Sequence, residues 1–253
     1  MRVEITIPCH NEAHRLEAGH GKLLAWIQRH PGHDISIVLA DNGSSDATLS
    51  IARRLAQHSV VPCRVRHLDA AGLALALRDA WDSSTADIVG YCDTDMATDL
   101  DHLTQVIAHF DSDPRLLAVN GTRWHPDSRI SARSPRRRLF SWMLRTGIRH
   151  LTGIRATDIA CGFKFFRRPW YATQSARLFS TQFFLGAELL YLAQRHAPGS
   201  VIEIPIRWND QPGSRVNIPR AMRSYWQGIC HLRRHCHDTF PQKENQTNQH
   251  QPD

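Results

Sequence analysis

Two aspartates one residue apart, Asp93 and Asp95, follow directly on a short apolar run at residues 88–92. Such a run is typical of a buried strand, and in an extended chain residues i and i+2 point to the same side. Two carboxylates at this spacing can hold one hard cation, Mg²⁺ or Mn²⁺, together with a diphosphate. The same residues also fit a strand-to-helix turn in which Asp99 caps a helix that begins at Leu100. The rest of the chain has to decide between a metal site and a turn.

The elements around this pair alternate between strands and helices. Apolar periodicity indicates strands at residues 2–8, 35–40, 61–67, 88–92 and 116–120, separated by helices at 14–30, 47–57, 72–81 and 100–110. This order predicts an α/β fold with a mostly parallel, doubly wound central sheet flanked by helices. Ligands of such sheets bind beyond the carboxyl ends of the strands, where Asp93 and Asp95 lie and where Asp41 ends the second strand. At that position Asp41 can accept hydrogen bonds from a base or a ribose.

The pattern changes after residue 120. We expect a mobile loop at residues 123–135, a helix at 139–151, strands at 159–167 and 201–208, helices at 185–195 and 219–234, and a turn-rich loop at 209–215. The chain therefore divides into one large domain at 1–218, with halves at 1–120 and 121–218, followed by a C-terminal amphipathic helix at 219–240. The polar tail at 241–253 is predicted to be disordered.

The composition of the 253 residues limits the class of protein. The N-terminal residues contain no long apolar segment, and no eighteen apolar residues follow one another, so neither a signal peptide nor a membrane span is expected. The six cysteines lack C-x-x-C spacing, which favours reduced thiols and a cytoplasmic location. The cysteines and histidines at residues 230–237 are a second, weaker candidate for a metal site. We expect a soluble protein, or one peripheral on the cytoplasmic face of a membrane.

Positive charge is concentrated in one part of the chain. Residues 121–155 contain nine arginines and one acid, a local balance of +8, whereas the whole chain carries +7. The helix at 139–151 has an apolar face and an arginine face, which suits a membrane surface or a phosphate group. An ordinary solvated helix has the same pattern. Nucleic-acid binding would leave the aligned carboxylates without a role, so we expect no nucleic-acid partner.

Four motifs in the first half match those of a known family in the same order. Residues 7–12 (IPCHNE) resemble I-P-x-Y-N-E, residues 41–48 (DNGSSDAT) resemble D-D-G-S-x-D-x-T, residues 72–76 (GLALA) resemble G-L-G-x-A, and residues 93–95 form a D-x-D element. The chain thus resembles the family 2 glycosyltransferases of the GT-A fold. It is most similar to the polyprenyl-phosphate sugar synthases, such as the dolichyl-phosphate mannose synthases and the dolichyl-phosphate β-glucosyltransferases.

The second half carries matching motifs too, so the resemblance covers residues 2–220. Residues 158–164 (DIACGFK) resemble D-x-x-C/S-G-F-K/R, residues 188–190 and 202–208 resemble E-L-L and E-V-P-V-x-W, and residues 212–215 (PGSR) resemble a G-S-K/R loop. Four positions depart from the family pattern, namely His10, Asn42, Ala74 and Gly186. Of these, Gly186 stands where the glucosyltransferases carry an acid.

The resemblance implies roles for individual residues. Residues 1–120 become the nucleotide-sugar-binding half and residues 121–218 the acceptor-binding half. The implied donor-binding residues are Pro8, Asn11, Glu12, Asp41, Asp93, Ser214 and Arg215. Asp93 and Asp95 would hold Mg²⁺ or Mn²⁺ against the donor diphosphate. The implied contacts to an acceptor phosphate are Arg123, Arg137, Arg138 and Ser141.

The implied reaction is the transfer of a hexose, with inversion, from a nucleotide sugar of the UDP-glucose or GDP-mannose type to a polyprenyl phosphate. Asp93, Asp95, Arg138 and Glu188 are the expected catalytic residues. A phosphate monoester has a second pKa of about 6, so at neutral pH it attacks without a general base. A membrane surface, and with it a membrane-protein partner, would bring that acceptor.

Two other interpretations stay open. The first is a soluble enzyme that glycosylates a hydroxyl group, for which Glu188 would be the base. The second is a relative that has lost catalysis, because four family positions are substituted.

Overall fold

A computed structural model of the 253-residue chain describes residues 1–131, 135–209 and 218–235, with side chains at 1–131, 141–209 and 219–234. The strands are β1 (Arg2–Cys9), β2 (Asp34–Asn42), β3 (Cys63–Leu68), β4 (Ile88–Cys92), β5 (Ala118–Thr122), β6 (Arg129–Ser131), β7 (Phe163–Arg167), β8 (Val201–Pro205) and β9 (Arg207–Asn209). The helices are α1 (Leu16–Arg29), α2 (Thr48–Gln57), α3 (Leu73–Asp82), α4 (His102–Ser112), α5 (Pro135–Thr152), α6 (Arg168–Gln174), the short 3-10 helix η1 (Ser175–Arg177), α7 (Leu185–His196) and α8 (Ile218–His235).

Seven of the described strands form one sheet in the order β3-β2-β1-β4-β7-β5-β8. Neighbouring strands are parallel except at β7, which runs antiparallel to β4 and β5. The first four strands therefore end at one edge, and their register aligns Asp41 with both Cys9 and His67. The expected α/β fold with a mostly parallel central sheet is confirmed. Strands β6 and β9 form a separate two-stranded sheet.

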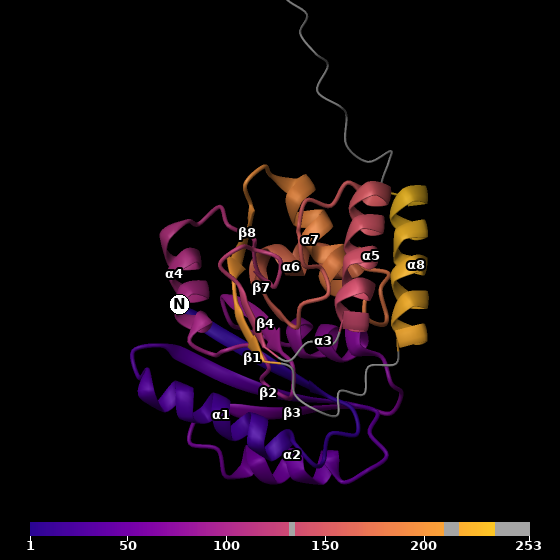
Figure 1. The fold of residues 1–253 in the computed structure, drawn as a ribbon. Helices are drawn as coiled ribbons and strands as arrows, with labels where there is room; N and C mark the ends of the chain where they lie inside the picture. Colours follow the sequence, from indigo (N-terminus) through magenta and orange to yellow (C-terminus); the bar gives the residue numbers. More distant parts are fainter. Residues whose placement is uncertain (132–134, 210–217, 236–253) are drawn as a thin grey trace, which may run out of the picture.

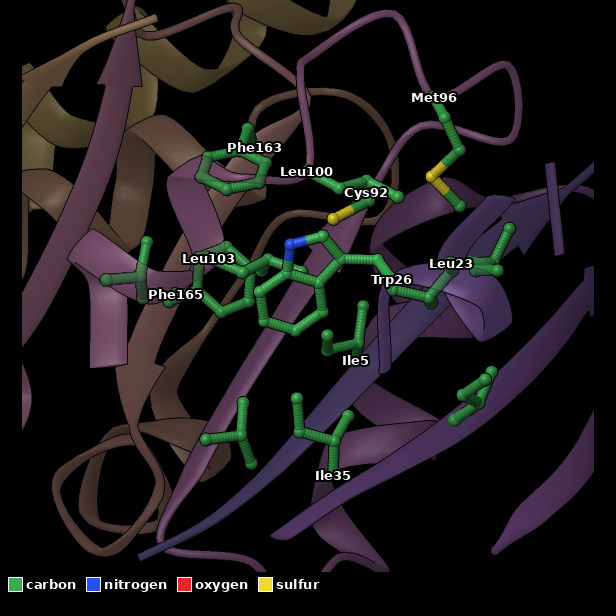
Figure 2. Packing of buried hydrophobic residues seen from close by; sticks show 14 of the residues in the cluster. Ile5, Leu23, Trp26, Ile35, Cys92, Met96, Leu100, Leu103, Phe163 and Phe165 are labelled. Atoms are coloured by element: carbon green, nitrogen blue, oxygen red, sulfur yellow. The ribbon is translucent and has the colours of Figure 1, made fainter. Parts of the chain in front are cut away.

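Helices cover both faces of the sheet (Figure 1). The alternation along β2 shows why: Ile37 and Leu39 contribute to one buried apolar cluster, and Val38 contributes to the other. The first cluster includes side chains of α1 and α4, and Figure 2 shows Trp26 of α1 at its centre. The second cluster includes side chains of α3, α7 and α8. Burial on both faces fixes the sheet and with it the edge at which the parallel strands end.

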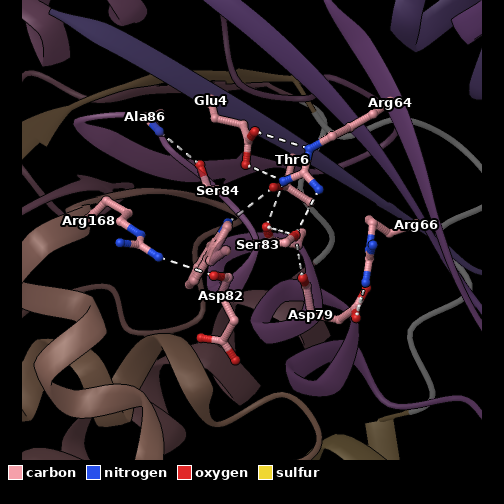
Figure 3. Close-up of polar contacts among 12 residues, drawn as sticks. Glu4, Thr6, Arg64, Arg66, Asp79, Asp82, Ser83, Ser84, Ala86 and Arg168 are labelled. Atoms are coloured by element: carbon pink, nitrogen blue, oxygen red, sulfur yellow. Dashed lines mark hydrogen bonds and ion pairs between the residues drawn. The ribbon is translucent and has the colours of Figure 1, made fainter.

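Polar contacts tie the strands and α3 together beneath that edge (Figure 3). Arg64 of β3 donates to the buried carboxylate of Glu4 in β1 at 2.9 Å, across the intervening strand. The indole Nε1 of Trp81 donates to Oγ1 of Thr6 at 3.1 Å, which fixes α3 on β1. Because these buried polar groups are paired, the first three strands and α3 form a well-defined platform.

The structure corrects several expected elements. The loop at 123–135 contains β6, and the strand at 201–208 is interrupted at Ile206 because β9 pairs with β6 instead of extending β8. The strand at 159–167 begins only at Phe163, and α6 and η1 were not expected. Helix α4 begins at His102 and not at Leu100, and its N-cap residue is Asp101 and not Asp99. The carboxylate of Asp99 accepts the backbone N–H of Asp101 at 2.9 Å and Nε of Arg207 at 2.7 Å.

Other expectations stay predictions. The disordered tail at 241–253 and most of the loop at 209–215 lie outside the described residues. The division at 218–219 falls at the first turn of α8. Among the described residues, every helix is either too short or too polar to cross a membrane.

Candidate active site

A tight turn, rather than a continued strand, brings Asp93 and Asp95 together. Strand β4 ends at Cys92, and the backbone N–H of Met96 donates to the carbonyl of Asp93 at 2.9 Å. The hydroxyl of Thr94 donates to the carbonyl of Pro8 at 2.7 Å, which joins the turn to the end of β1. Helix α1 passes close above, because a Cβ atom on Gly19 would lie only 2.0 Å from the carbonyl oxygen of Thr94. The turn is therefore fixed from two sides.

The carboxylate of Asp93 lies against the backbone of Gly162. A Cβ atom built on Gly162 would lie 1.9 Å from Oδ2 of Asp93, and the backbone N–H of Asp93 donates to the Gly162 carbonyl at 3.1 Å. The group that approaches this glycine closely is therefore the Asp93 carboxylate. Position 162 therefore has to be glycine if Asp93 is to keep this orientation.

Charges of both signs surround Asp93. The side chain of Asp93 is exposed, yet the protein around it partly desolvates the carboxyl group; this desolvation and the charge of Asp95 raise the pKa of Asp93 to about 6. Arg123 and Lys164 act in the opposite direction, and Glu12 adds to the increase. A cation next to Asp93 would oppose both effects and stabilise the ionised carboxylate.

Asp95 is partly committed to the protein. Its Oδ1 accepts the backbone N–H of Ala97 at 3.0 Å, and its Oδ2 lies 3.8 Å from Nη1 of Arg15. Arg15, the residue before α1, also pairs with Glu12. One guanidinium thus contacts both Glu12 and Asp95. The outer lone pairs of Asp95 stay available to a ligand.

Asp93 and Asp95 fit a cation whose remaining ligands are supplied by the substrate. Among residues 1–131, 141–209 and 219–234, no three His, Cys, Asp or Glu side chains cluster as a ready-made metal site. Mg²⁺ usually binds through one or two carboxylates, water and substrate phosphates. Asp93 and Asp95, one residue apart in a fixed turn, match that arrangement. The candidate cluster at 230–237 lies partly outside the described residues, and within it His231 stacks on Phe179 with ring centroids 3.7 Å apart.

Two loops at the ends of β1 and β2 are joined by Asn11. Its side-chain oxygen accepts the backbone N–H groups of Ser45 at 2.8 Å and of Asp46 at 3.3 Å. Its own backbone has a φ of 55°, a left-handed conformation that asparagine tolerates better than most residues. The backbone N–H of Glu12 donates to Thr48 at 2.8 Å. The two motif loops thus form one unit next to Pro8.

Asp41 is buried at the end of β2, with 1% of its surface exposed. Its Oδ2 accepts a hydrogen bond from Nδ1 of His67 at 2.7 Å, whereas its Oδ1 has no partner. Asn42, which replaces the second acid of the motif, instead accepts the backbone N–H of Gly72. This contact stabilises the loop before α3.

Arg123 is buried and paired, so it does not extend freely toward an acceptor. Its Nε and Nη2 donate to the two oxygens of Asp158 at 2.7 and 2.9 Å, and its guanidinium lies 5.2 Å from the ring centroid of Trp208. Burial lowers the pKa of Arg123, but Asp158 outweighs this effect and the net pKa is raised. A phosphate at Arg123 would have to share or replace the Asp158 carboxylate.

Lys164 lies in the motif at residues 158–164, and the sequence alone predicted no role for it. In the structure it lies on β7 opposite Tyr91 of β4, two residues before Asp93. Its side chain is fully buried and its ammonium group donates to the carbonyl of Cys161. Burial lowers the pKa of Lys164. A Cβ atom on Gly186 would lie 2.9 Å from Cδ of Lys164. The glycine that replaces the family acid therefore leaves room for the lysine.

Glu188, the expected general base, is 2% exposed. Its two carboxylate oxygens accept the backbone N–H groups of Phe179 and Ser180 at 3.0 and 3.1 Å. Burial raises the pKa of Glu188, and these hydrogen bonds partly oppose it. In this arrangement the carboxylate organises the segment before α7.

The remaining predicted residues are described only in part. Ser141 lies half-buried on α5. The side chains of Arg137 and Arg138 lie outside the described part of α5, and Ser214 and Arg215 lie outside the described residues altogether. The structure therefore brings together Pro8, Asn11, Glu12, Asp93 and Asp95, and places Asp41 two strands away on the same edge.

More than half of the chain matches a known protein family. The family described as "Glycosyl transferase family 2" matches residues 4–173, which include most of β1, all of β2 to β7 and both carboxylates. The chain belongs to glycosyl transferase family 2. The expected family is thereby confirmed, and the protein is a glycosyltransferase by family.

Curated relatives in this family cover most of the chain. Glycosyltransferase AglD of Haloferax volcanii is 29% identical over 90% of the chain, which spans 37% of AglD. The human dolichyl-phosphate β-glucosyltransferase is 27% identical over 85% of the chain and 69% of its own length.

A solved structure supports the fold. Glucosyl-3-phosphoglycerate synthase from Mycobacterium tuberculosis, crystallised with Mn²⁺, UDP and glucosyl-3-phosphoglycerate, superposes with a TM-score of 0.63 at 15% identity. The match covers 91% of this chain and 78% of that structure. The expected GT-A fold is confirmed by this neighbour.

Proposed function

We propose that this member of glycosyl transferase family 2 transfers a hexose from a nucleotide sugar to a polyprenyl phosphate, with inversion at the anomeric carbon. One observation carries the proposal: the carboxylates of Asp93 and Asp95, one residue apart in a fixed turn, stand on the same sheet edge as the unpartnered oxygen of Asp41. A cation with a diphosphate fits the first place and a base fits the second. The human relative is named as a dolichyl-phosphate β-glucosyltransferase, which supports the acceptor class.

Asp93 and Asp95 are the proposed ligands of the cation. Bound there, Mg²⁺ or Mn²⁺ would supply Lewis-acid stabilisation of the charge that grows on the leaving diphosphate. Gly162 and Thr94 hold the turn that presents both carboxylates, and Arg15 fixes Asp95 and Glu12. We propose that Pro8, Asn11 and Glu12 line the donor pocket at the ends of β1 and β2. Ser214 and Arg215 are proposed to close over the donor.

Glu188, the expected general base, is not available to a substrate. Glu188 is buried and bonded to two backbone N–H groups, which makes it a poor acceptor for a substrate proton. A phosphate dianion needs no proton removed before it attacks. The proposed contacts to the acceptor phosphate are three residues of α5, namely Arg137, Arg138 and Ser141. Of these, Arg138 is also proposed as a catalytic residue. Arg123 would contribute only if Asp158 released part of its guanidinium.

Two neighbouring helices are the proposed contact with a membrane surface. Helices α5 and α8 pack side by side (Figure 1), and together they contain nine arginines and no acid. Among the side chains that the structure describes on them, at 141–152 and 219–234, four large apolar ones are exposed: Trp142 (51%), Met143 (58%), Met222 (43%) and Trp226 (61%). Exposed tryptophans next to arginines suit the interface of an anionic bilayer. We propose that the chain works on the cytoplasmic face of a membrane, alone or with a membrane-protein partner.

A transfer assay tests the acceptor. Purified protein is incubated with Mn²⁺, radiolabelled UDP-glucose or GDP-mannose, and either a short-chain polyprenyl phosphate or the matching polyprenol. Label is expected in the phosphate lipid and not in the polyprenol. Transfer to hydroxyl acceptors alone would replace the proposal by the second candidate, a hydroxyl glycosyltransferase. Asp95→Asn is expected to reduce transfer at least about 100-fold, whereas Asp127→Asn, at an exposed acid, is the matched control.

A sedimentation assay tests the membrane surface. The double variant Trp142→Ala/Trp226→Ala should lose binding to vesicles that contain phosphatidylglycerol. The control Leu75→Ala removes an apolar side chain that is 38% exposed on α3, and it should bind like the wild type. Binding that is equal in all three proteins would contradict this part of the proposal.

A further inference from the structure

A cavity of about 450 Å³ lies between helix α1, the segment that follows Asp95, and the small sheet of β6 and β9. Small-molecule sites in proteins have volumes of this order. The polar side chains of its lining that could bind a ligand come from three elements, namely Lys22 of α1, Arg129 and Ser131 of β6, and Arg207 and Asn209 of β9. The cavity can therefore hold a small organic molecule, and its charges indicate the chemistry of that molecule.

Two arginines stand side by side on the small sheet. The parallel register of β6 and β9 pairs Arg129 with Arg207 and Ser131 with Asn209. The hydroxyl of Ser131 donates to Oδ1 of Asn209 at 2.7 Å, so side chains at paired positions meet on this face. Because residues i and i+2 of a strand share a face, Arg129 and Arg207 lie on that face too. Like charges at paired positions repel each other, and an anion between them would remove the repulsion.

The charges on the lining do not balance. Arg207 has acidic partners, since its Nε donates to the Asp99 carboxylate at 2.7 Å and its Nη2 lies 3.5 Å from the carboxylate of Asp101. Among the side chains that the structure describes, no carboxylate pairs with Lys22 or Arg129, and both are exposed. Two positive charges are thus left on the lining. A phosphate monoester, which carries a charge of about −1.5 to −2 at neutral pH, matches them.

Backbone hydrogen bonds hold the lining in place. The N–H of Asp99 donates to the carbonyl of Arg207 at 3.0 Å, and the N–H of Asn209 donates to the carbonyl of Ala97 at 2.8 Å. Strand β9 is therefore fixed on one side to residues 97–99 and on the other side to β6. A cavity with such a lining is largely preformed, which reduces the entropic cost of binding a ligand.

We propose that this cavity binds a small soluble phosphate monoester, such as a sugar phosphate, at a site separate from those of the donor and the acceptor. Lys22 and Arg129 bind the phosphate group, because the planar guanidinium can donate to two of its oxygens and the ammonium group adds a second charge. The organic part lies against the apolar residues of the lining, namely Met96, Ala97, Ile130 and Trp208. Because Met96 directly follows Asp95, the ligand lies next to the turn that presents the two carboxylates.

The location of the cavity favours a soluble ligand over a lipid. Trp208 packs against the first apolar cluster, which includes side chains of α1 and α4. Side chains of α5 and α8 contribute to the second cluster, on the other face of the central sheet. The helices that are proposed to contact a membrane thus belong to the face opposite the cavity. The ligand therefore reaches the cavity from solvent.

Calorimetric titration with glucose 6-phosphate, in EDTA to remove divalent cations, tests this site. Lys22→Gln and Arg129→Gln are each expected to weaken binding about tenfold, because a hydrogen bond to a charged group is worth about that factor. Arg53→Gln, at an exposed arginine of α2, is the matched control and should bind like the wild type. No binding by the wild type, or equal binding by all four proteins, overturns the inference.

Two further measurements separate this site from other phosphate sites. Arg138→Gln, in the proposed acceptor site, should bind glucose 6-phosphate like the wild type. Binding that is lost in Arg138→Gln and kept in Arg129→Gln would assign the phosphate to the acceptor site, which overturns the inference and leaves the proposed function intact. Vesicles that contain phosphatidic acid, a lipid phosphate monoester, should bind the wild type and Arg129→Gln equally. Weaker binding of vesicles by Arg129→Gln would assign the cavity to a lipid headgroup and overturn the soluble ligand.

Discussion

Replacing Gly162 by alanine is expected to push the carboxylate of Asp93 out of place. The new Cβ atom would lie 1.9 Å from Oδ2, 2.1 Å from Cγ and 2.2 Å from Oδ1 of Asp93, whereas ordinary contacts of a Cβ atom begin at 3.4 Å. The carboxylate therefore has to move by about 1.5 Å, the difference between 3.4 and 1.9 Å. Asp93 reaches solvent, so its side chain can turn outward and the fold can persist.

The size of the effect follows from that displacement. Misplacing a reacting or positioning group by about 1 Å lowers a rate on the order of 100-fold. The turnover number of Gly162→Ala should thus fall at least about 100-fold, equivalent to about 2.7 kcal/mol in the activation free energy. The assay is radiolabelled sugar transfer at saturating donor and Mn²⁺, with thermal unfolding followed by circular dichroism on the same sample.

A second glycine supplies the control. A Cβ atom on Gly21 in α1 would meet nothing within 4 Å. Gly21→Ala should keep full activity and stabilise the helix by up to about 1 kcal/mol. A folded Gly162→Ala protein with the wild-type turnover number would refute the placement of Asp93 against Gly162 as a catalytic requirement.

Two further predictions concern the loops and the buried ion pair. Asn11→Ala removes the oxygen that accepts from Ser45 and Asp46 and leaves a side chain strained at a φ of 55°, so the Michaelis constant for the donor should rise about tenfold; an unchanged value would contradict the loop linkage. Burial raises the pKa of Asp158, but Arg123 outweighs it and holds the net pKa below 3.8. The ion pair therefore contributes to the free energy of unfolding at pH values above the pKa that Asp158 has in the unfolded chain. This contribution is lost as the pH falls through the lower pKa that Asp158 has in the folded protein. Loss of the pair costs about 3–5 kcal/mol, and urea titrations from pH 6 to pH 2 should show a steeper acid loss in wild type than in Asp158→Asn.

Much of the fold could be predicted from local pattern. The β-α alternation up to residue 120 places an apolar core on both sheet faces, so the period of the side chains alone indicates each element there. The fold of the second half was harder to predict, because it depends on pairing between strands that are far apart in the sequence. Strand β9 leaves the line of β8 to pair with β6, and β7 enters the sheet antiparallel between β4 and β5. The local sequence of residues 123–135 and 201–208 does not predict which strands pair.

The candidate site shows the same division. Asp93, Asp95 and Asp41 could be predicted because they follow apolar strands at the ligand-binding edge of the sheet. The residues that orient them could not, since Gly162 and His67 act through contacts with Asp93 and Asp41 across 69 and 26 residues of chain. The buried Lys164 had one available signal, a charged residue within the apolar run of residues 163–166. The predicted contact of Arg123 with an acceptor phosphate stays a prediction, because Asp158 already occupies its guanidinium.

The carboxylate pair beyond β4 is the centre of this account, and Mn²⁺ binding measures it directly. Electron paramagnetic resonance can follow free Mn²⁺ during titration of the wild-type protein, with and without UDP, and of Asp93→Asn/Asp95→Asn. Because only two protein carboxylates contribute, we expect Mn²⁺ to bind at least about tenfold more tightly when UDP is present, and the double variant to lose this increase. Equal binding of Mn²⁺ and UDP by the wild type and the double variant would contradict the account.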